Sequence, residues 1–254
     1  MRGRRIPLSR ARRLVIDFLH FAKGVPTVPV QRRIKLQPVI EARALLSDRP
    51  AWTAIMVKAF AVVSAEFPEL RRAYCKFPWP HLYEVPAPVA SVVVERDFEG
   101  EKAIFIGRVK DPAALPLPDL TNRLRAFNET PVEGVRDFHR PLRMLRYPRP
   151  IRRALWWLGL NWGRQRGRHF GTFGISVYSA LGAESLHPLS PLPTILDYGV
   201  FSPEGEVELR VVYDHRVMDG AVVARALGRV EEVLAGPIVE ELRRLAASQA
   251  SRAA

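Results

Sequence analysis

The chain has 254 residues, of which 48% are hydrophobic and 26% are charged, and its formal net charge is +13. This composition is typical of a folded globular domain and excludes a disordered, collagen-like or low-complexity protein. The single cysteine, Cys75, can form neither an internal disulfide nor a thiolate zinc cluster, which favours a reducing compartment. Charged residues interrupt every apolar run well before the roughly 18 residues of a membrane span, and the basic N-terminus lacks a signal-peptide cleavage site. We therefore expect a cytoplasmic protein.

Two segments carry the positive charge. Residues 1–35 hold ten Lys or Arg against one Asp, and residues 136–168 hold ten Arg against one Asp, which leaves the rest of the chain at −5. In the second segment Trp156, Trp157 and Trp162 are interleaved with arginines on a helix predicted to start near Pro150. This mixture suits the surface of an anionic membrane, where the protein would be peripheral; alternatively, the tryptophans fill a core or a subunit contact and the arginines are solvated. No nucleic-acid-binding motif accompanies the charge, so we expect no nucleic-acid partner.

Hydrophobic periodicity predicts the elements in chain order. Helical spacing covers residues 9–22, within a basic N-terminal arm of residues 1–28, and residues 51–67 form a buried helix that ends before Pro68. Next come a hairpin of strands 89–94 and 103–106, a helix over 120–127, and an irregular excursion over 131–150, where four prolines restrict regular pairing. Three strands lie in 170–178, 194–201 and 206–213, and Gly236-Pro237 separates a helix over 221–234 from a last helix ending near residue 247. We expect residues 29–254 to form one α/β domain, with helices against a mixed or antiparallel sheet and an Arg/Trp-rich insertion near 131–168.

The most specific pattern is the string DHRVMDGA, residues 214–221, at the junction between the last strand and the following helix. It resembles the signature of the catalytic domain of 2-oxoacid dehydrogenase dihydrolipoyl acyltransferases, in the chloramphenicol acetyltransferase-like superfamily. Three further stretches are similar to that family in the same order: VKAFAVVSAEFPELRRAY (57–74), GTFGIS (171–176) and the prolines near 191–193. The resemblance covers most of residues 30–240. It implies a two-layer α+β sandwich with a mixed sheet covered by helices.

An acyl transfer from a thioester needs a base for the nucleophile and a hydrogen-bond donor for the tetrahedral oxyanion. His215 suits the first role, since an ordinary imidazole, with a pKa of about 6.5, is mostly neutral at cytoplasmic pH. The resemblance implies that His215 is the general base and that Ser176 stabilises the oxyanion without being a nucleophile. It also implies that Asp219 holds the histidine loop by pairing with Arg33 or Arg32. Gly220 is expected to allow a tight turn in which a side chain would clash.

The function expected from these residues is a stand-alone acyltransferase that uses acyl-coenzyme A and an unidentified acceptor. A basic segment about thirty residues long precedes the part of the chain that carries the resemblance. We therefore expect the chain to work without a lipoyl arm of its own. One alternative is a transacylase core acting on the dihydrolipoyl group of a separate protein, and another is a non-catalytic scaffold. The resemblance further implies a homotrimer in which His215 of one subunit faces Ser176 of the next. No pair of histidines has metal-ligand spacing on a credible helix, so no metal is expected.

Overall fold

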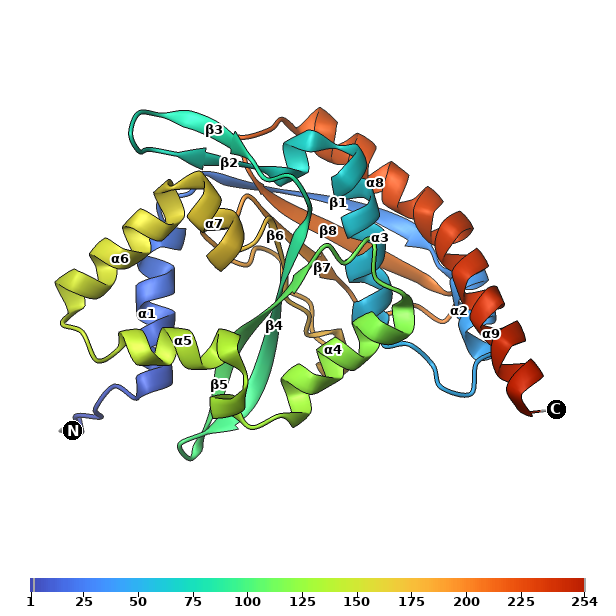
Figure 1. The fold of residues 1–254 in the computed structure, drawn as a ribbon, viewed down its shortest axis with the longest axis horizontal. Helices are drawn as coiled ribbons and strands as arrows, with labels where there is room; N and C mark the ends of the chain where they lie inside the picture. Colours follow the sequence, from blue (N-terminus) through green and yellow to red (C-terminus); the bar gives the residue numbers. More distant parts are fainter. Residues whose placement is uncertain (2, 254) are drawn as a thin grey trace.

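A mixed six-stranded sheet organises the chain (Figure 1), which is seen here in a computed structural model that describes residues 1 and 3–253. The strand order is β1-β8-β7-β6-β4-β5. The short central β6 is parallel to β4 and to β7, and the other neighbours are antiparallel. The strands are β1 (Thr27–Lys35), β4 (Val89–Phe98), β5 (Glu101–Lys110), β6 (Phe173–Ile175), β7 (Thr194–Tyr198) and β8 (Glu206–Asp214). The predicted mixed sheet and the β4–β5 hairpin are therefore confirmed.

The main core lies between one face of this sheet and a layer of helices. Its central helix, α3 (Trp52–Glu66), buries residues on every side, because its sequence is apolar almost throughout, and it ends before Pro68 as predicted. On β8, Leu209 and Val211 face this core while the intervening residues face the opposite side. The same layer contains α2 (Gln37–Ala44), α4 (Leu117–Glu129), α8 (Gly220–Val233) and α9 (Val239–Ala253).

The opposite face of the sheet carries a smaller apolar cluster of Leu192, Ile195 and Val212, with Phe170 packed against it. Around this side lie four helices: α1 (Arg10–Ala22), α5 (Arg136–Met144), α6 (Arg149–Asn161) and α7 (Gly163–His169). Figure 1 shows them grouped at one end of the molecule, away from α9. A separate two-stranded hairpin, β2 (Arg72–Cys75) and β3 (His81–Glu84), projects beside α6 and α7.

Two predictions about proline were wrong. Residues 131–150 are largely helical, because Pro150 lies in the first turn of α6, where its missing N–H would have had no partner, and the short helix α5 contains Pro141. Gly236-Pro237 does not separate the last two helices. A π-helical turn over Leu234–Ile238 accommodates Pro237, and the chain passes through it from α8 into α9.

The basic N-terminal segment contains a helix that packs against the Arg/Trp-rich segment. Asp17 of α1 is only 1% exposed and accepts a 2.8 Å hydrogen bond from Arg152 Nε of α6. The rings of Phe18 and Phe21 lie 6.3 and 6.1 Å from that of Trp156. The two alternatives predicted for the tryptophans apply to different residues. Trp156 is buried in this contact and fills a core, whereas Trp157 and Trp162 are exposed. In the part of the chain that the structure describes, no helix has both the length and the apolarity to span a bilayer.

Candidate active site

His215 lies in the tight turn that joins β8 to α8. The turn is held to the rest of the sheet by main-chain hydrogen bonds: His215 N–H donates to the carbonyl of Pro26 at 3.0 Å, and Asp214 N–H donates to that of Pro193 at 2.8 Å. The His215 side chain is half exposed, with its ring 5.6 Å from that of Tyr213. The backbone of the histidine is thus fixed while its ring stays open to an approaching molecule.

A buried ion pair beneath this turn was not predicted from the sequence. Asp214 is fully buried, and its two carboxylate oxygens accept bonds of 2.9 and 2.7 Å from the Arg216 guanidinium and one of 3.0 Å from the Arg216 N–H. The guanidinium carbon also lies 4.6 Å from the centre of the Tyr74 ring. The DHR triplet of residues 214–216 could have predicted this ion pair. The side chains of Asp214 and Arg216 point away from that of His215 and can therefore meet beneath the turn. These contacts make the turn rigid.

Arg166, from the Arg/Trp-rich segment, also stabilises the surroundings of the turn. It is only 5% exposed and donates to the carbonyls of Leu160 at 2.9 Å and Pro191 at 2.6 Å. Burial lowers the pKa of this guanidinium to about 10, with nearby Asp214 acting in the opposite direction. Since Pro191 precedes Pro193, which accepts the bond from Asp214, this arginine supports the loop that holds the histidine turn.

Asp219 is close to His215 but does not have the partner expected for it. Its Oδ1 lies 3.5 Å from His215 Nδ1, and its side chain is 82% exposed. Arg33 Nε donates to Glu208 at 2.8 Å, and Arg32 Nε donates to Glu231 at 2.8 Å. The predicted pairing of Asp219 with Arg33 or Arg32 was therefore wrong, because β1 runs antiparallel to β8 and places Arg33 opposite Glu208, far along the strand from the turn.

Gly220 begins α8, but not for the reason expected. It is not one of the glycines with a left-handed φ, and a Cβ there would lie 3.3 Å from the hydroxyl at the end of the Tyr213 side chain. Tyr213 is buried, so a methyl group at this position would fit only if the tyrosine ring moved by a few tenths of an ångström. The turn gains its tightness from the hydrogen bonds of Asp214 and His215 instead.

Ser176 lies level with the middle of β8, well away from the end of that strand that carries His215. It follows Ile175, which pairs with Leu196 on β7, and Leu196 pairs with Val211 on β8. Ser176 is thus level with Arg210, and the five residues from Arg210 to His215 span about 17 Å of extended chain. This separation far exceeds hydrogen-bond distance, so His215 and Ser176 of one chain cannot act on the same atom.

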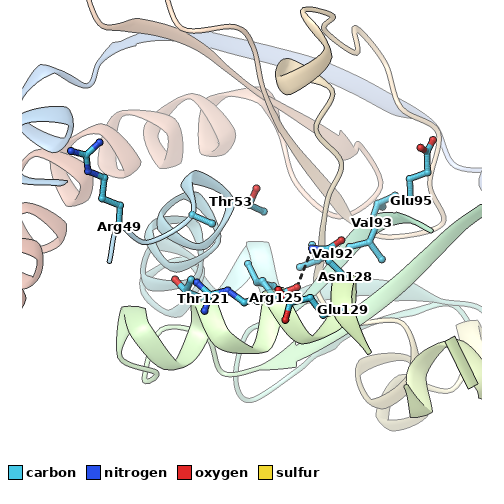
Figure 2. A pocket seen from close by; sticks show the side chains of 12 residues that line it. Arg49, Thr53, Val92, Val93, Glu95, Thr121, Arg125, Asn128 and Glu129 are labelled. Carbon is cyan, nitrogen blue, oxygen red and sulfur yellow. Dashed lines mark hydrogen bonds between the residues drawn. The ribbon is translucent and has the colours of Figure 1, made fainter. Parts of the chain in front are cut away.

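A cavity of about 490 Å³ opens between β4, α4 and the start of α3 (Figure 2). β4 continues past the point where its pairing with β6 stops at Val92, so its next residues line the cavity together with α4 and the start of α3. Figure 2 shows the polar side chains drawn around it, among them Thr53, Arg125 and Asn128. The buried Ser176 directly follows Ile175, which is paired with Val92, but Ser176 does not itself line this cavity.

Within the described part of the chain, no group of three or more His, Cys, Asp or Glu side chains is placed to hold a metal ion. Cys75 is buried, and burial raises the pKa of its thiol. A buried neutral thiol is a poor nucleophile. Of the residues predicted to carry the chemistry, His215 therefore remains the candidate base and Ser176 the candidate hydroxyl donor.

Comparison with solved structures defines the class of fold. The structure superposes on the dihydrolipoamide acetyltransferase of Azotobacter vinelandii with a TM-score of 0.69 and 16% sequence identity, covering 92% of each chain. The cubic core of a pyruvate dehydrogenase multienzyme complex gives 0.66 and 16% identity, also covering 92% of each chain. A chloramphenicol acetyltransferase gives 0.52 and 12% identity over 90% of this chain and 98% of the other. No protein-family model and no curated protein sequence matches.

The chain therefore has the chloramphenicol acetyltransferase-like fold, in the form found in the catalytic cores of 2-oxoacid dehydrogenase complexes. The sequence resemblance predicted this fold, and the structural matches confirm it. Because the sequence identities are low, the structural matches establish the fold alone, and the reaction depends on the residues of the site.

Proposed function

We propose that this protein is an acyltransferase that moves an acyl group from coenzyme A to an acceptor nucleophile. One observation carries the proposal: the H-x-x-x-D-G pattern of residues 215–220 occupies a rigid strand-to-helix turn in a fold shared with acyltransferases. An imidazole with a fixed main chain and an open ring suits a general base. Acyl-coenzyme A enters as a co-substrate, and no metal takes part.

His215 starts the reaction by accepting a proton. Its Nδ1 faces Asp219 at 3.5 Å, which leaves Nε2 as the nitrogen that takes the proton from the acceptor's hydroxyl, amine or thiol. The acceptor then forms a bond to the thioester carbonyl carbon, whose π electrons move to oxygen. Collapse of this oxyanion breaks the carbon–sulfur bond, and the departing thiolate of coenzyme A takes the proton back from the imidazolium. Asp219 stabilises the imidazolium between the two steps.

The oxyanion requires a donor that the same chain does not supply to His215. We propose a homotrimer in which Ser176 of one subunit donates its hydroxyl to the oxyanion formed at His215 of the next. The separation of the two residues by about half the length of β8 supports this arrangement, as does the half-exposed ring of His215, which one chain alone does not shield from water. Likeness to a protein described as a cubic core of a multienzyme complex points to the same self-association.

A second candidate is a transacylase core whose acceptor is the dihydrolipoyl thiol of a separate protein. The specific observation in its favour is that the structure is closer to dihydrolipoamide acetyltransferase than to chloramphenicol acetyltransferase, with TM-scores of 0.69 and 0.52. The proton transfers at His215 would be the same. Only the nucleophile differs, so the two candidates are separated by the choice of acceptor.

We also propose that the acceptor is met at an anionic membrane surface. The exposed Trp157 and Trp162 lie beside Phe77 of the β2–β3 hairpin, with ring centres 6.3 and 6.4 Å from it, and the segment around them has a charge of +9. Exposed aromatic rings beside arginines suit the headgroup region. The variant Trp157→Ser/Trp162→Ser should sediment less with phosphatidylserine vesicles than the wild type, and equal sedimentation would remove this surface from the proposal.

The decisive experiment follows release of coenzyme A by chromatography. Purified protein is mixed with acyl-coenzyme A thioesters of several lengths and with either dihydrolipoamide or a cell lipid extract. Acceptor-dependent release should fall by about 10²–10⁴ in His215→Ala and by about 10²–10³ in Ser176→Ala. The matched control is His139→Ala, which removes an exposed histidine from α5 and should leave the rate unchanged. Release in His215→Ala at the wild-type rate would contradict the proposal, and no release with any pair would favour a scaffold.

A further inference from the structure

A pocket of about 310 Å³ lies between the second face of the sheet and the helices around it. Its walls are mostly apolar and come from six separate helices and strands and two loops. Neither His215 nor Ser176 lines it. The main wall residues are Phe18, Ile106, Met144, Leu155, Trp156 and Phe170.

The strand β5 shows why the pocket is open. Phe105 and Val109 point into the main core, so Ile106 and Arg108 point to the opposite face. There they line the pocket together with residues of α5 and α6, and α1, which is bonded to α6 through Asp17 and Arg152, adds Phe18 to its wall. The space left between these layers is the pocket.

Positive charge collects on one side of the pocket without matching negative charge. Arg108 is paired with Asp137, whose other oxygen accepts the Arg108 N–H at 2.8 Å. Arg140 has no carboxylate partner within the described residues, and its guanidinium contacts a ring nitrogen of His169 at 2.8 Å instead. Arg168 lies close enough to act on the same histidine. Two guanidinium groups, those of Arg108 and Arg140, therefore line the pocket beside one carboxylate.

We propose that this pocket binds an anionic amphiphile, an apolar chain that ends in a carboxylate, with the chain between Ile106, Leu155 and Trp156 and the carboxylate against Arg140 and His169. The planar guanidinium of Arg140 matches a carboxylate in two parallel hydrogen bonds. The apolar walls exclude water from the chain. A ligand without the carboxylate would leave Arg140 without an anionic partner. A ligand without the apolar chain would leave the apolar walls exposed to water.

The volume sets the size of the chain. A cavity of 150 Å³ accommodates the six carbon atoms of benzene, so about 310 Å³ accommodates roughly twelve non-hydrogen atoms. A ten-carbon carboxylate has that size. Decanoate is therefore the probe of choice.

The electrostatics of His169 support an anion at this place. Burial and the charges of Arg140, Arg108 and Arg168 lower the pKa of His169 to about 4, against a weaker opposite effect of Asp137. A bound carboxylate would offset the three cations. Its binding should raise the pKa of His169, which gives a local readout of the site.

The experiment measures binding by isothermal titration calorimetry, without coenzyme A, so its outcome does not depend on the proposed acyl transfer. Decanoate, below its micelle-forming concentration, should bind at least ten-fold more tightly than decanol, and acetate should not bind detectably. Arg140→Gln should weaken decanoate at least ten-fold and leave decanol unchanged. Leu155→Trp, which fills the pocket from its rim, should weaken both. A histidine titration by NMR should show a higher pKa for His169 in the decanoate complex.

The matched control is Arg143→Gln, which removes the same charge from the same helix at an exposed position outside the pocket. It should leave decanoate binding unchanged. The inference is overturned if folded wild-type protein does not bind decanoate, if decanol binds as tightly, or if Arg143→Gln weakens binding as much as Arg140→Gln. Decanoate binding without coenzyme A release in the transfer assay would uphold this site and reject the transfer.

Discussion

Two titratable groups with shifted pKa values respond to pH in opposite directions. Burial lowers the pKa of His169 to about 4, with help from Arg140, Arg108 and Arg168. Burial raises the pKa of Asp197 to about 6, although Arg210, at 3.4 Å, acts against the shift. Because the pKa of His169 is lowered in the fold, His169 makes the protein less stable as the pH falls. Because the pKa of Asp197 is raised, Asp197 makes the protein less stable as the pH rises. A single substitution can separate the two effects.

The substitution His169→Gln should make stability less dependent on pH between about 6.5 and 4. The unfolded histidine takes up a proton near pH 6.5 and the folded one only near 4, so the wild type loses stability as the pH falls through this range. Urea unfolding at pH 7 and pH 4.5 should show a smaller loss for the variant. His139→Gln, on α5, is the control and should lose as much stability as the wild type. If His169→Gln also lost as much stability as the wild type between these two pH values, the expectation would be refuted.

Gly171, the first residue of the GTFGIS string, is required by its backbone. Its φ is +85°, and a Cβ would lie 2.8 Å from the carbonyl oxygen of Val89, which is held in the sheet. We expect Gly171→Ala to lower the free energy of unfolding by about 1–3 kcal/mol. Gly220→Ala, where only the end of Tyr213 is near, should change it by less than about 1 kcal/mol. Chemical denaturation tests both, and equal losses would show that the local geometry is not the cause.

Contacts between α1 and α6 hold together two segments that both carry high positive charge. Their contact includes the Asp17–Arg152 bond, the ring of Trp156 against Phe18 and Phe21, and a second arginine, Arg153, 3.7 Å from Asp17. A carboxylate between two arginines reduces their repulsion in a place shielded from water. The position of α6, and with it the second pocket, depends on this contact.

Removing Asp17 should therefore be costly. Asp17→Leu leaves Arg152 buried without its carboxylate, and we expect a loss of about 3–5 kcal/mol in the free energy of unfolding. Arg10→Gln, which breaks the exposed pair with Glu99, should cost less than about 1 kcal/mol. Adding Arg152→Met to Asp17→Leu should restore much of the loss. A double variant as unstable as the single one would mean that the charge pair is not what holds the helices.

Self-association decides whether the whole molecule has a working site. His215 and Ser176 of one chain lie too far apart to act on the same atom, so the proposed site, with one as base and the other as hydroxyl donor, needs two chains. In the proposed trimer each interface joins His215 of one subunit to Ser176 of the next. The arrangement can be tested by mixing subunits that are inactive for different reasons.

Equal amounts of His215→Ala and Ser176→Ala protein, unfolded and refolded together, should recover about a quarter of the wild-type rate, because one interface in four combines an intact histidine with an intact serine. Each variant refolded alone is the control. Light scattering should report a trimer for all samples. Absence of recovery in a mixed trimer would show that both residues act within one chain or that one of them has no part.

Local patterns were sufficient for most elements and for the position of His215. The long apolar run of α3, the alternation of β8 and the string of residues 214–221 are continuous in the chain, so short-range spacing identified them. Proline was misjudged where its effect depends on its place in a helix, as at Pro150 and Pro237. The neighbours of Asp219 were misjudged because strand register, which moves Arg33 away from the turn, is a long-range property.

By itself, the sequence determined most helices and strands through their periodicity, the turn that carries the candidate base through one contiguous motif, and the class of fold through its resemblance to a known family in four stretches. Only the tertiary structure decided that Asp214 and Arg216 form an ion pair beneath that turn, that Ser176 lies far from His215 of the same chain, and that Arg140 and His169 meet an apolar pocket. Such contacts join residues tens of positions apart, and their geometry arises only when strands are paired and helices are packed against them.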